Sequence, residues 1–384
     1  MQKVSRDYHL MFWIGGVFLA PILFFFDFRQ LDGIHLTQSH LIVGRDFLNV
    51  WTGGQLVLSD SLNILYDYQR YMEWQSLRFG PLDAYNYSYP PSSLFLAAPF
   101  GTLPYIAALM LWTILGAVFF YWAARPYMPQ NLAPIFALLT PAALVNIWMG
   151  HYGFVIGGLW LLFFSSIERY PVRSGILAGL LTLKPHLGLL IAAVMLYRRM
   201  TLSIAVALLV TVALVVASGW AFGFDLWTQW IFDTSALQAR IMNAPGEKFY
   251  YLMMPSTYIA LRNNPHMLAA IGQIIMAVAA LVLMWKARNA KPKELAFVAA
   301  SATALISPYI FNYDLTVASL GFVIFLYGKW GSLQVWEKHI LWLAFASPLF
   351  VMAFNLLAPI SLLAGLYVQT RHIEEGRGVR LSIL

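Results

Sequence analysis

The sequence predicts an all-α polytopic membrane protein. Hydrophobic residues make up 60% of the 384 residues, charged residues make up only 11%, and the mean hydropathy is +0.68. A soluble domain could not bury so much apolar surface. Apolar runs of about 20 residues, the length that crosses a bilayer, recur along the chain. We therefore expect one integral membrane domain over residues 1–384.

Charge and cysteine content narrow the classes of function. The net charge is +7, but the cations lie in short linkers between apolar segments. The positive-inside rule accounts for that placement, which argues against nucleic acid as a partner and for membrane lipids. The chain has no cysteine, which excludes disulfides, thiolate metal sites and cysteine nucleophiles. It also has no Asp-x-Asp pair and no His/Asp cluster with metal-ligand spacing.

The apolar runs predict the membrane-spanning helices. The first, at 9–28, has a basic start and no small-residue cleavage site, so we interpret it as a retained span and not as a signal peptide. We expect the others at roughly 104–123, 132–149, 152–168, 201–221, 267–287, 295–312, 315–328, 339–355 and 357–370. The linker cations are expected on the cytoplasmic side. They are Lys3, Arg6, Arg125, Arg169, Arg173, Arg198, Arg199, Lys286, Arg288, Lys291, Lys293, Lys329, Lys338, Arg371, Arg377 and Arg380.

The run 174–197 is long enough for one crossing, but a crossing would carry Arg198 and Arg199 to the outside. Lys184-Pro185-His186 interrupts the run at its middle. We therefore predict a broken or re-entrant hairpin that returns to the cytoplasm, with this polar triplet at its tip. The alternative is a single span kinked at proline, whose lysine extends toward the interface.

With this topology, two large loops lie on the non-cytoplasmic side, at 29–91 and 222–266, together with short turns at Gly150-His151 and Ser307–Asp314. In the first loop, an apolar stripe after Asp46 and the segment Tyr66–Phe79 predict two amphipathic helices in the interface. Pro90-Pro91 then starts a short half-helix back toward the membrane. The polar clusters gather on one side, which predicts a shared site there.

Asp46 is the first candidate for chemistry. It follows a hydrophobic segment, and its apolar, membrane-proximal neighbours should partly desolvate it, while Arg45 could tune its charge. A carboxylate in such a place can act as general base toward a hydroxyl group. The alternative is an ordinary solvated loop acid.

Several short motifs follow one another in a characteristic order. They are Asp46-Phe47, Trp51 with Gly54, Leu65-Tyr66-Asp67, Tyr87 with Tyr89-Pro90-Pro91, Leu103-Pro104, Gly150-His151-Tyr152-Gly153-Phe154, Ala178-Gly179 through Lys184-Pro185, and Ser307-Pro308. In this order they resemble glycosyltransferase family 87, part of the C-type superfamily of polytopic membrane enzymes. The resemblance covers most of the chain.

The resemblance implies a C-type glycosyltransferase fold with about 10 transmembrane helices. It implies inverting transfer of mannose or a similar hexose or pentose, without metal or other cofactor. The donor would be a polyprenyl-phosphate sugar and the acceptor a lipid or glycan. The site would face the periplasm from the bacterial inner membrane. In the family's mycobacterial phosphatidylinositol-mannoside mannosyltransferase the aspartate of this loop is the catalytic base, which corresponds to Asp46. Members more often carry Gln at the position of His151, and some carry a histidine after Ser-Pro where this chain has Tyr309 to Asp314.

Further candidates are weighed by their charge and position. The cations that could meet the donor phosphate are Lys184, Arg240, Lys248 and Arg262. The residues that could bind sugar or acceptor are His151, Tyr87, Tyr89, His186, Asn312, Tyr313 and Asp314. Structural roles compete with these assignments: surface cations in the second loop, a satisfied turn histidine, helix caps at Asn312 or Asp314, and tyrosines that anchor the loop at the headgroups.

Two other classes of function remain open on the sequence. The first is a transporter or flippase of a lipid-linked saccharide, with the hairpin and Lys184 on its path. The absence of an inverted repeat, and polar residues on one face and not at the midplane, favour an enzyme. The second is a membrane scaffold without chemistry.

Overall fold

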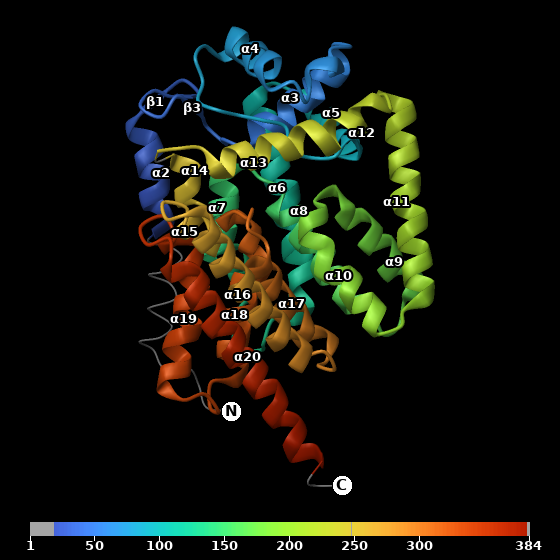
Figure 1. The fold of residues 1–384 in the computed structure, drawn as a ribbon, viewed down its shortest axis with the longest axis vertical. Helices are drawn as coiled ribbons and strands as arrows, with labels where there is room; N and C mark the ends of the chain where they lie inside the picture. The colour runs from blue at the N-terminus through green and yellow to red at the C-terminus, as the bar shows by residue number, and fades with distance from the viewer. Residues whose placement is uncertain (1–18, 247, 382–384) are drawn as a thin grey trace.

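The computed structural model describes residues 19–246 and 248–381, and this part of the chain is almost entirely helical (Figure 1). The first predicted span, 9–28, lies partly outside the described residues; its second half forms α2 (Leu19–Arg29). The described residues contain one small antiparallel sheet, β1 (Leu31–Asp32), β2 (His35–Leu36) and β3 (Leu41–Ile42), in that order. The expected all-α membrane character is confirmed.

Within the described residues, three segments are long and apolar enough to cross a membrane: Tyr105–Tyr127, Thr201–Phe222 and His266–Lys286. They contain α6 (Tyr105–Ala124), α11 (Thr201–Phe222) and α16 (His266–Lys286), close to the predicted boundaries. The other helices of the bundle are α7 (Pro141–Met149), α8 (Gly153–Ser166), α17 (Pro292–Ile306), α18 (Thr316–Lys329), α19 (Val335–Phe350) and α20 (Leu357–Leu381). These apolar helices indicate an integral membrane protein.

Four predicted helices have wrong boundaries. The helix expected over 339–355 is displaced toward the N-terminus and forms Val335–Phe350. The helix expected over 132–149 begins only at Pro141, after the 3₁₀ turn η5 (Pro134–Leu138). The helix expected to end at 312 ends at Ile306, before Ser307-Pro308. Proline has no N–H and disfavours helix in the preceding residue, so it starts helices more readily than it continues them. The last helix extends to Leu381, beyond the expected end at 370.

The predicted hairpin consists of α9 (Pro171–Leu180), the 3₁₀ turn η6 (Leu181–Leu183) and α10 (Pro185–Tyr197). The Oγ atoms of Ser174 and Ser203 lie 2.9 Å apart, so α9 starts beside the start of α11. Since α10 ends just before α11 begins, both ends of the hairpin lie at one end of α11, and the chain turns back at Lys184. The 13 residues of α10 rise only about 20 Å, less than a bilayer core. This is a broken hairpin and not a single kinked span.

The first large loop, 29–91, contains α3 (Phe47–Leu58), the 3₁₀ turn η2 (Leu62–Ile64) and α4 (Tyr68–Phe79). The 3₁₀ turn η3 (Pro91–Ser93) and the half-helix α5 (Leu94–Gly101) follow it. α3 has the predicted apolar stripe, and its polar side is buried as well. Asn49 accepts a hydrogen bond from Tyr71 (3.0 Å), and Thr52 accepts one from Gln75 (3.0 Å), both from α4. α3 is therefore packed between α4 and α5.

The second outer loop forms α12 (Asp225–Gln229), the π-helical turn η7 (Trp230–Thr234), α13 (Ser235–Asn243), α14 (Phe249–Leu252) and α15 (Thr257–Ala260). In Figure 1, α13 runs across one end of the bundle below α3 and α5. Trp230 Nε1 donates to the carbonyl oxygen of Ser88 (3.1 Å), which joins the two loops. The 3₁₀ turn η8 (Asn312–Leu315) reaches the same end, since the Asn312 amide donates to Met253 O (2.8 Å).

Candidate active site

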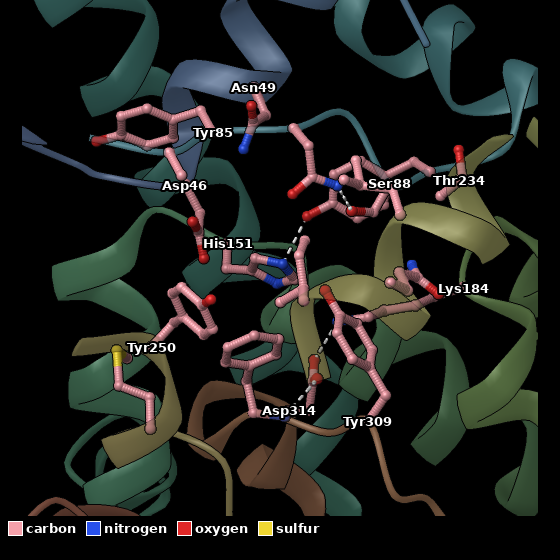
Figure 2. A pocket seen from close by; sticks show the side chains of 18 of the residues that line it. Asp46, Asn49, Tyr85, Ser88, His151, Lys184, Thr234, Tyr250, Tyr309 and Asp314 are labelled. Atoms are coloured by element: carbon pink, nitrogen blue, oxygen red, sulfur yellow. Dashed lines mark hydrogen bonds and ion pairs between the residues drawn. The ribbon is translucent and has the colours of Figure 1, made fainter. Parts of the chain in front are cut away.

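A cavity of about 700 Å³ lies where these segments meet. It is lined by residues of both outer loops, of the turn after α7, of the hairpin tip and of the segment that ends in η8 (Figure 2). Of the residues singled out in the sequence, it brings together Asp46, Tyr89, His151, Lys184, His186, Arg240, Lys248, Tyr313 and Asp314.

Three predicted site residues do not line this cavity. The hydroxyl of Tyr87 is hydrogen-bonded to Ser93 Oγ (2.6 Å). Asn312 is fully buried and its side-chain amide donates to the carbonyl of Pro348 (2.8 Å). The guanidinium of Arg262 lies over the ring of Tyr251, 3.7 Å from its centroid. In all three cases the side chain joins neighbouring segments of the outer end to one another.

Asp46 occupies the N-cap position of α3, yet its side chain accepts no capping hydrogen bond from the helix. Its half-buried carboxylate lies at the cavity wall (Figure 2). Desolvation raises the pKa of Asp46 from 3.8 to about 6, against a hydrogen bond from Tyr313 and the charges of Lys184 and Arg45, which lower it. At neutral pH the carboxylate is therefore mostly ionised and can accept a proton.

Arg45, next to Asp46, is held by contacts on several sides. Its guanidinium forms an ion pair with Asp27 of α2 and lies 4.2 Å from the ring centroid of Trp148 and 5.3 Å from that of Phe249. Its backbone has φ 36°, in the left-handed region that costs an L-residue about 1–2 kcal/mol. Asp27 was missed in the sequence, where it belongs to the end of the first apolar run; an acid in such a run was the available signal.

Gly150 brings the turn after α7 against the segment that carries Asp46. It ends α7 in the left-handed conformation, with φ 62°. A Cβ atom at this position would lie 2.6 Å from Cβ of Phe47 and 2.9 Å from the carbonyl oxygen of Gly44. Glycine is therefore required both for the backbone angle and for the close approach. Its neighbour His151 enters the cavity beside Asp46 (Figure 2).

His151 is buried between two tyrosines. Its Nε2 atom is 2.5 Å from the hydroxyl of Tyr89, and its ring stacks on Tyr313 with centroids 3.9 Å apart and an interplanar angle of 23°. Burial, with the nearby charges of Lys184 and His186, lowers the pKa of His151 well below 6.5, so the ring is neutral. Its Nδ1 atom has no hydrogen-bond partner among the described residues. A neutral imidazole can offer that nitrogen to a hydroxyl group.

Lys184, at the hairpin tip, forms an ion pair with Asp314 of η8. The other carboxylate oxygen of Asp314 accepts a hydrogen bond from the backbone N–H of Phe311 (3.3 Å), so the capping role considered for Asp314 is present as well. Lys184 also lies 5.4 Å from the ring centroid of Tyr313. An ammonium group has three N–H donors, so one ion pair leaves donors for a ligand.

Sequence reasoning missed several other lining residues, most of them aromatic. They include Asn49, Tyr68, Trp230, Phe249, Tyr250, Tyr309 and Phe311. Aromatic rings are common at membrane interfaces, so their presence in the outer loops carried no specific signal. Once they line a cavity around a carboxylate, they offer flat apolar faces with polar edges, which suit a sugar ring.

The helical membrane fold and this cavity define a membrane enzyme whose site lies at one end of the helix bundle. The chain belongs to glycosyltransferase family 87, whose family model matches residues 87–308, more than half of the sequence. It is therefore a membrane glycosyltransferase, as the resemblance in the sequence implied. A search of curated proteins and a search of solved structures found no match. Asp46 precedes the matched range and Asp314 follows it.

Proposed function

We propose that the protein is an inverting glycosyltransferase that moves a sugar from a polyprenyl-phosphate donor to a lipid or glycan acceptor, with Asp46 as general base. One observation carries this proposal. Asp46 presents a carboxylate to the cavity without an ion pair or capping bond among the described residues, and its pKa of about 6 suits a base at neutral pH.

The reaction is a direct displacement. Asp46 removes the proton from the acceptor hydroxyl while that oxygen attacks the anomeric carbon of the donor sugar. The bond between this carbon and the phosphate oxygen breaks, and the phosphate leaves with the bonding electrons. Attack opposite the leaving group inverts the anomeric centre, and no covalent enzyme intermediate forms.

The leaving phosphate needs positive charge on the side of the sugar away from Asp46. Lys184 supplies it from the hairpin tip, and Arg240 and Lys248 of the second large loop also line the cavity. Charge-assisted hydrogen bonds from such groups stabilise the developing charge of a leaving phosphate. Arg262 lies outside the cavity lining and has no part in this assignment.

The sugar and acceptor are held by the remaining polar and aromatic groups. The groups assigned to this role are Tyr89, His151, His186, Tyr313 and Asp314. The unpartnered Nδ1 atom of His151 supports a hydrogen bond to a sugar or acceptor hydroxyl. Mannose or a similar hexose or pentose is the proposed sugar, and no metal or other cofactor takes part.

We propose the C-type fold as one domain over residues 1–384, with about ten spans and the hairpin. The loops at 29–91 and 222–266 face the periplasm from the bacterial inner membrane. The linkers after α10 and α16 carry cations and meet each other, since Arg198 Nη2 donates to the carbonyl of Ala290 (2.7 Å). The positive-inside rule assigns that end to the cytoplasm.

The absence of cysteine allows a direct test of this orientation. Ser59→Cys, exposed after α3, and Ser332→Cys, exposed between α18 and α19, serve as matched single-cysteine variants. A membrane-impermeant maleimide added to spheroplasts should label Ser59→Cys alone. Labelling of Ser332→Cys alone would reverse the proposed orientation.

The activity test uses purified protein, a panel of polyprenyl-phosphate sugars and membrane-lipid acceptors, with the product detected by mass spectrometry. Asp46→Asn should reduce turnover about 10²- to 10⁴-fold while donor binding is retained. Asp60→Asn, an exposed acid of the same loop, is the control and should match wild type. If Asp46→Asn keeps its turnover, Asp46 is not the general base. If the protein moves a lipid-linked saccharide across the membrane and forms no glycosylated product, it is a flippase.

A further inference from the structure

Asp27, at the end of α2, is a buried carboxylate that does not line the cavity. Both of its oxygens are bound. One forms the ion pair with Arg45, and the other accepts a hydrogen bond from Nε1 of Trp148 (2.7 Å). A buried charge is tolerated only when it is paired in this way. Asp27 therefore connects α2, the segment that carries Asp46 and the last turn of α7.

Arg45 depends on this connection. Its left-handed backbone is unfavourable for a residue with a Cβ atom, so contacts of its side chain must compensate. The ion pair with Asp27 and the ring of Trp148 are such contacts. The next residue is Asp46, which starts α3, so the backbone of Arg45 sets the direction in which the Asp46 carboxylate leaves the chain.

We propose that Asp27 is a positioning residue for catalysis, which holds Arg45 in its left-handed conformation and thereby directs Asp46 into the cavity. The proposal rests on the role of Asp46 as base. Asp27 touches none of the reacting groups, and it acts through Arg45 on one side and through Trp148 on the other. Trp148 lies three residues before His151, so the same carboxylate fixes both segments that flank Asp46.

Loss of Asp27 should also change the electrostatic surroundings of Asp46. The charged and titratable groups around Asp46 are Arg45, Tyr85, Tyr89, Tyr105, His151, Lys184, Tyr309, Tyr313 and Asp314. Arg45 lowers the pKa of Asp46 by its charge. If Asp27 holds Arg45 in place, its removal releases that cation and the pKa of Asp46 rises. If Arg45 stays in place, the loss of a nearby negative charge shifts the pKa in the opposite direction.

The test is the Asp27→Asn variant of the full-length protein. We expect kcat to fall about 10- to 100-fold, the cost of a small misplacement of a catalytic group, with KM for the donor within about threefold of wild type. The acid limb of the kcat/KM profile should move to higher pH. Arg45→Gln should shift it in the same direction, and the double variant should lose little more than the worse single variant, because both changes break one unit.

Asp32→Asn is the matched control, since Asp32 is an exposed acid of the same segment. It should keep the kinetics and pH profile of wild type. Three results would each overturn the proposal. The first is a wild-type kcat in Asp27→Asn, and the second is an acid limb of its kcat/KM profile that stays in place or moves to lower pH. The third is full additivity of the effects of Asp27→Asn and Arg45→Gln. If Asp27→Asn does not fold, Trp148→Phe removes one hydrogen bond to Asp27 and keeps a ring beside Arg45, and it should show the same loss of kcat to a smaller degree.

Failure of this inference is distinguishable from failure of the proposed function. If Asp46→Asn keeps its turnover, the base assignment fails whatever Asp27→Asn does. If Asp46→Asn is inactive and Asp27→Asn behaves as wild type, only the positioning role fails.

Discussion

The end of the helix bundle that holds the cavity contains two buried ion pairs, which differ in their relation to the cavity. Lys184 pairs with Asp314, and both side chains line the cavity. Arg45 pairs with Asp27, whose carboxylate lies outside the lining. The first pair therefore joins a cation and an acid of the cavity, whereas the second binds the cation next to Asp46 to an acid outside the cavity. Among the acids that line the cavity in the described ranges 19–246 and 248–381, Asp314 has an ion pair, and Asp46 and Asp83 have none.

The largest effect on stability should come from breaking the pair inside the cavity. Lys184→Met leaves Asp314, whose side chain is only 1% exposed, as a buried charge without its partner. Loss of one member of a buried pair lowers the free energy of unfolding by about 3–5 kcal/mol. Unfolding in detergent, followed by circular dichroism, measures the change.

The double variant Lys184→Met/Asp314→Leu should recover most of that stability, since it removes both charges. Asp46→Asn breaks no ion pair and should cost far less than Lys184→Met. Equal losses in Lys184→Met and Asp46→Asn would contradict the distinction between the two carboxylates.

The next effect concerns the contact that places Asp46 beside His151. Gly150→Ala puts a methyl group into the left-handed backbone and within 2.6 Å of Phe47 Cβ. We expect the free energy of unfolding to fall by about 1–3 kcal/mol and kcat to fall with it. Gly328→Ala is the control, because that helical glycine is exposed with open space around it, and alanine there should stabilise by about 0.5–1 kcal/mol. Unchanged kcat in Gly150→Ala would show that the approach of the two segments is not needed for catalysis.

A smaller effect on stability and turnover is expected from two tyrosine variants, one at a residue that lines the cavity and one at a residue that does not. Tyr89→Phe leaves Nε2 of His151 without its partner, and Tyr87→Phe removes a bond to Ser93 outside the cavity. Each should lower the free energy of unfolding by about 1 kcal/mol. Turnover should fall in Tyr89→Phe alone, measured by product formation at saturating donor. A matching fall in Tyr87→Phe would show that the cavity lining does not decide which tyrosine contributes.

The last effect is a pH dependence of stability at Asp46. Folding raises the pKa of this carboxyl from 3.8 to about 6, so the folded state binds its proton more tightly than the unfolded state does. The stabilisation is complete below about pH 4 and is lost as the pH rises to about 6. The free energy of unfolding of wild type, minus that of Asp46→Asn, should decrease over this window. A difference that rises with pH would mean that Asp46 is stabilised in its charged form.

Much of the architecture was predictable because its signals are local. The length of apolar runs located α6, α11 and α16, and the polar triplet at Lys184 located the hairpin tip. The helix expected over 132–149 failed, because two prolines confine its regular part to Pro141–Met149. The apolar stripe expected on α3 is present, but the burial of its polar face could not be predicted, since it depends on hydrogen-bond partners such as Tyr71 and Gln75.

The sequence by itself determined the membrane class, the glycosyltransferase family and nine of the residues that line the cavity. The tertiary structure decided what each polar side chain does. Lys184 faces the cavity, whereas Asn312 joins two segments by a hydrogen bond. The tertiary structure also decided the pairing of Arg45 with Asp27 and of Lys184 with Asp314, which are 18 and 130 residues apart in the chain. Ion pairing depends on distance in space and has no local pattern in the sequence, so only the tertiary structure shows how the cations near Asp46 are paired.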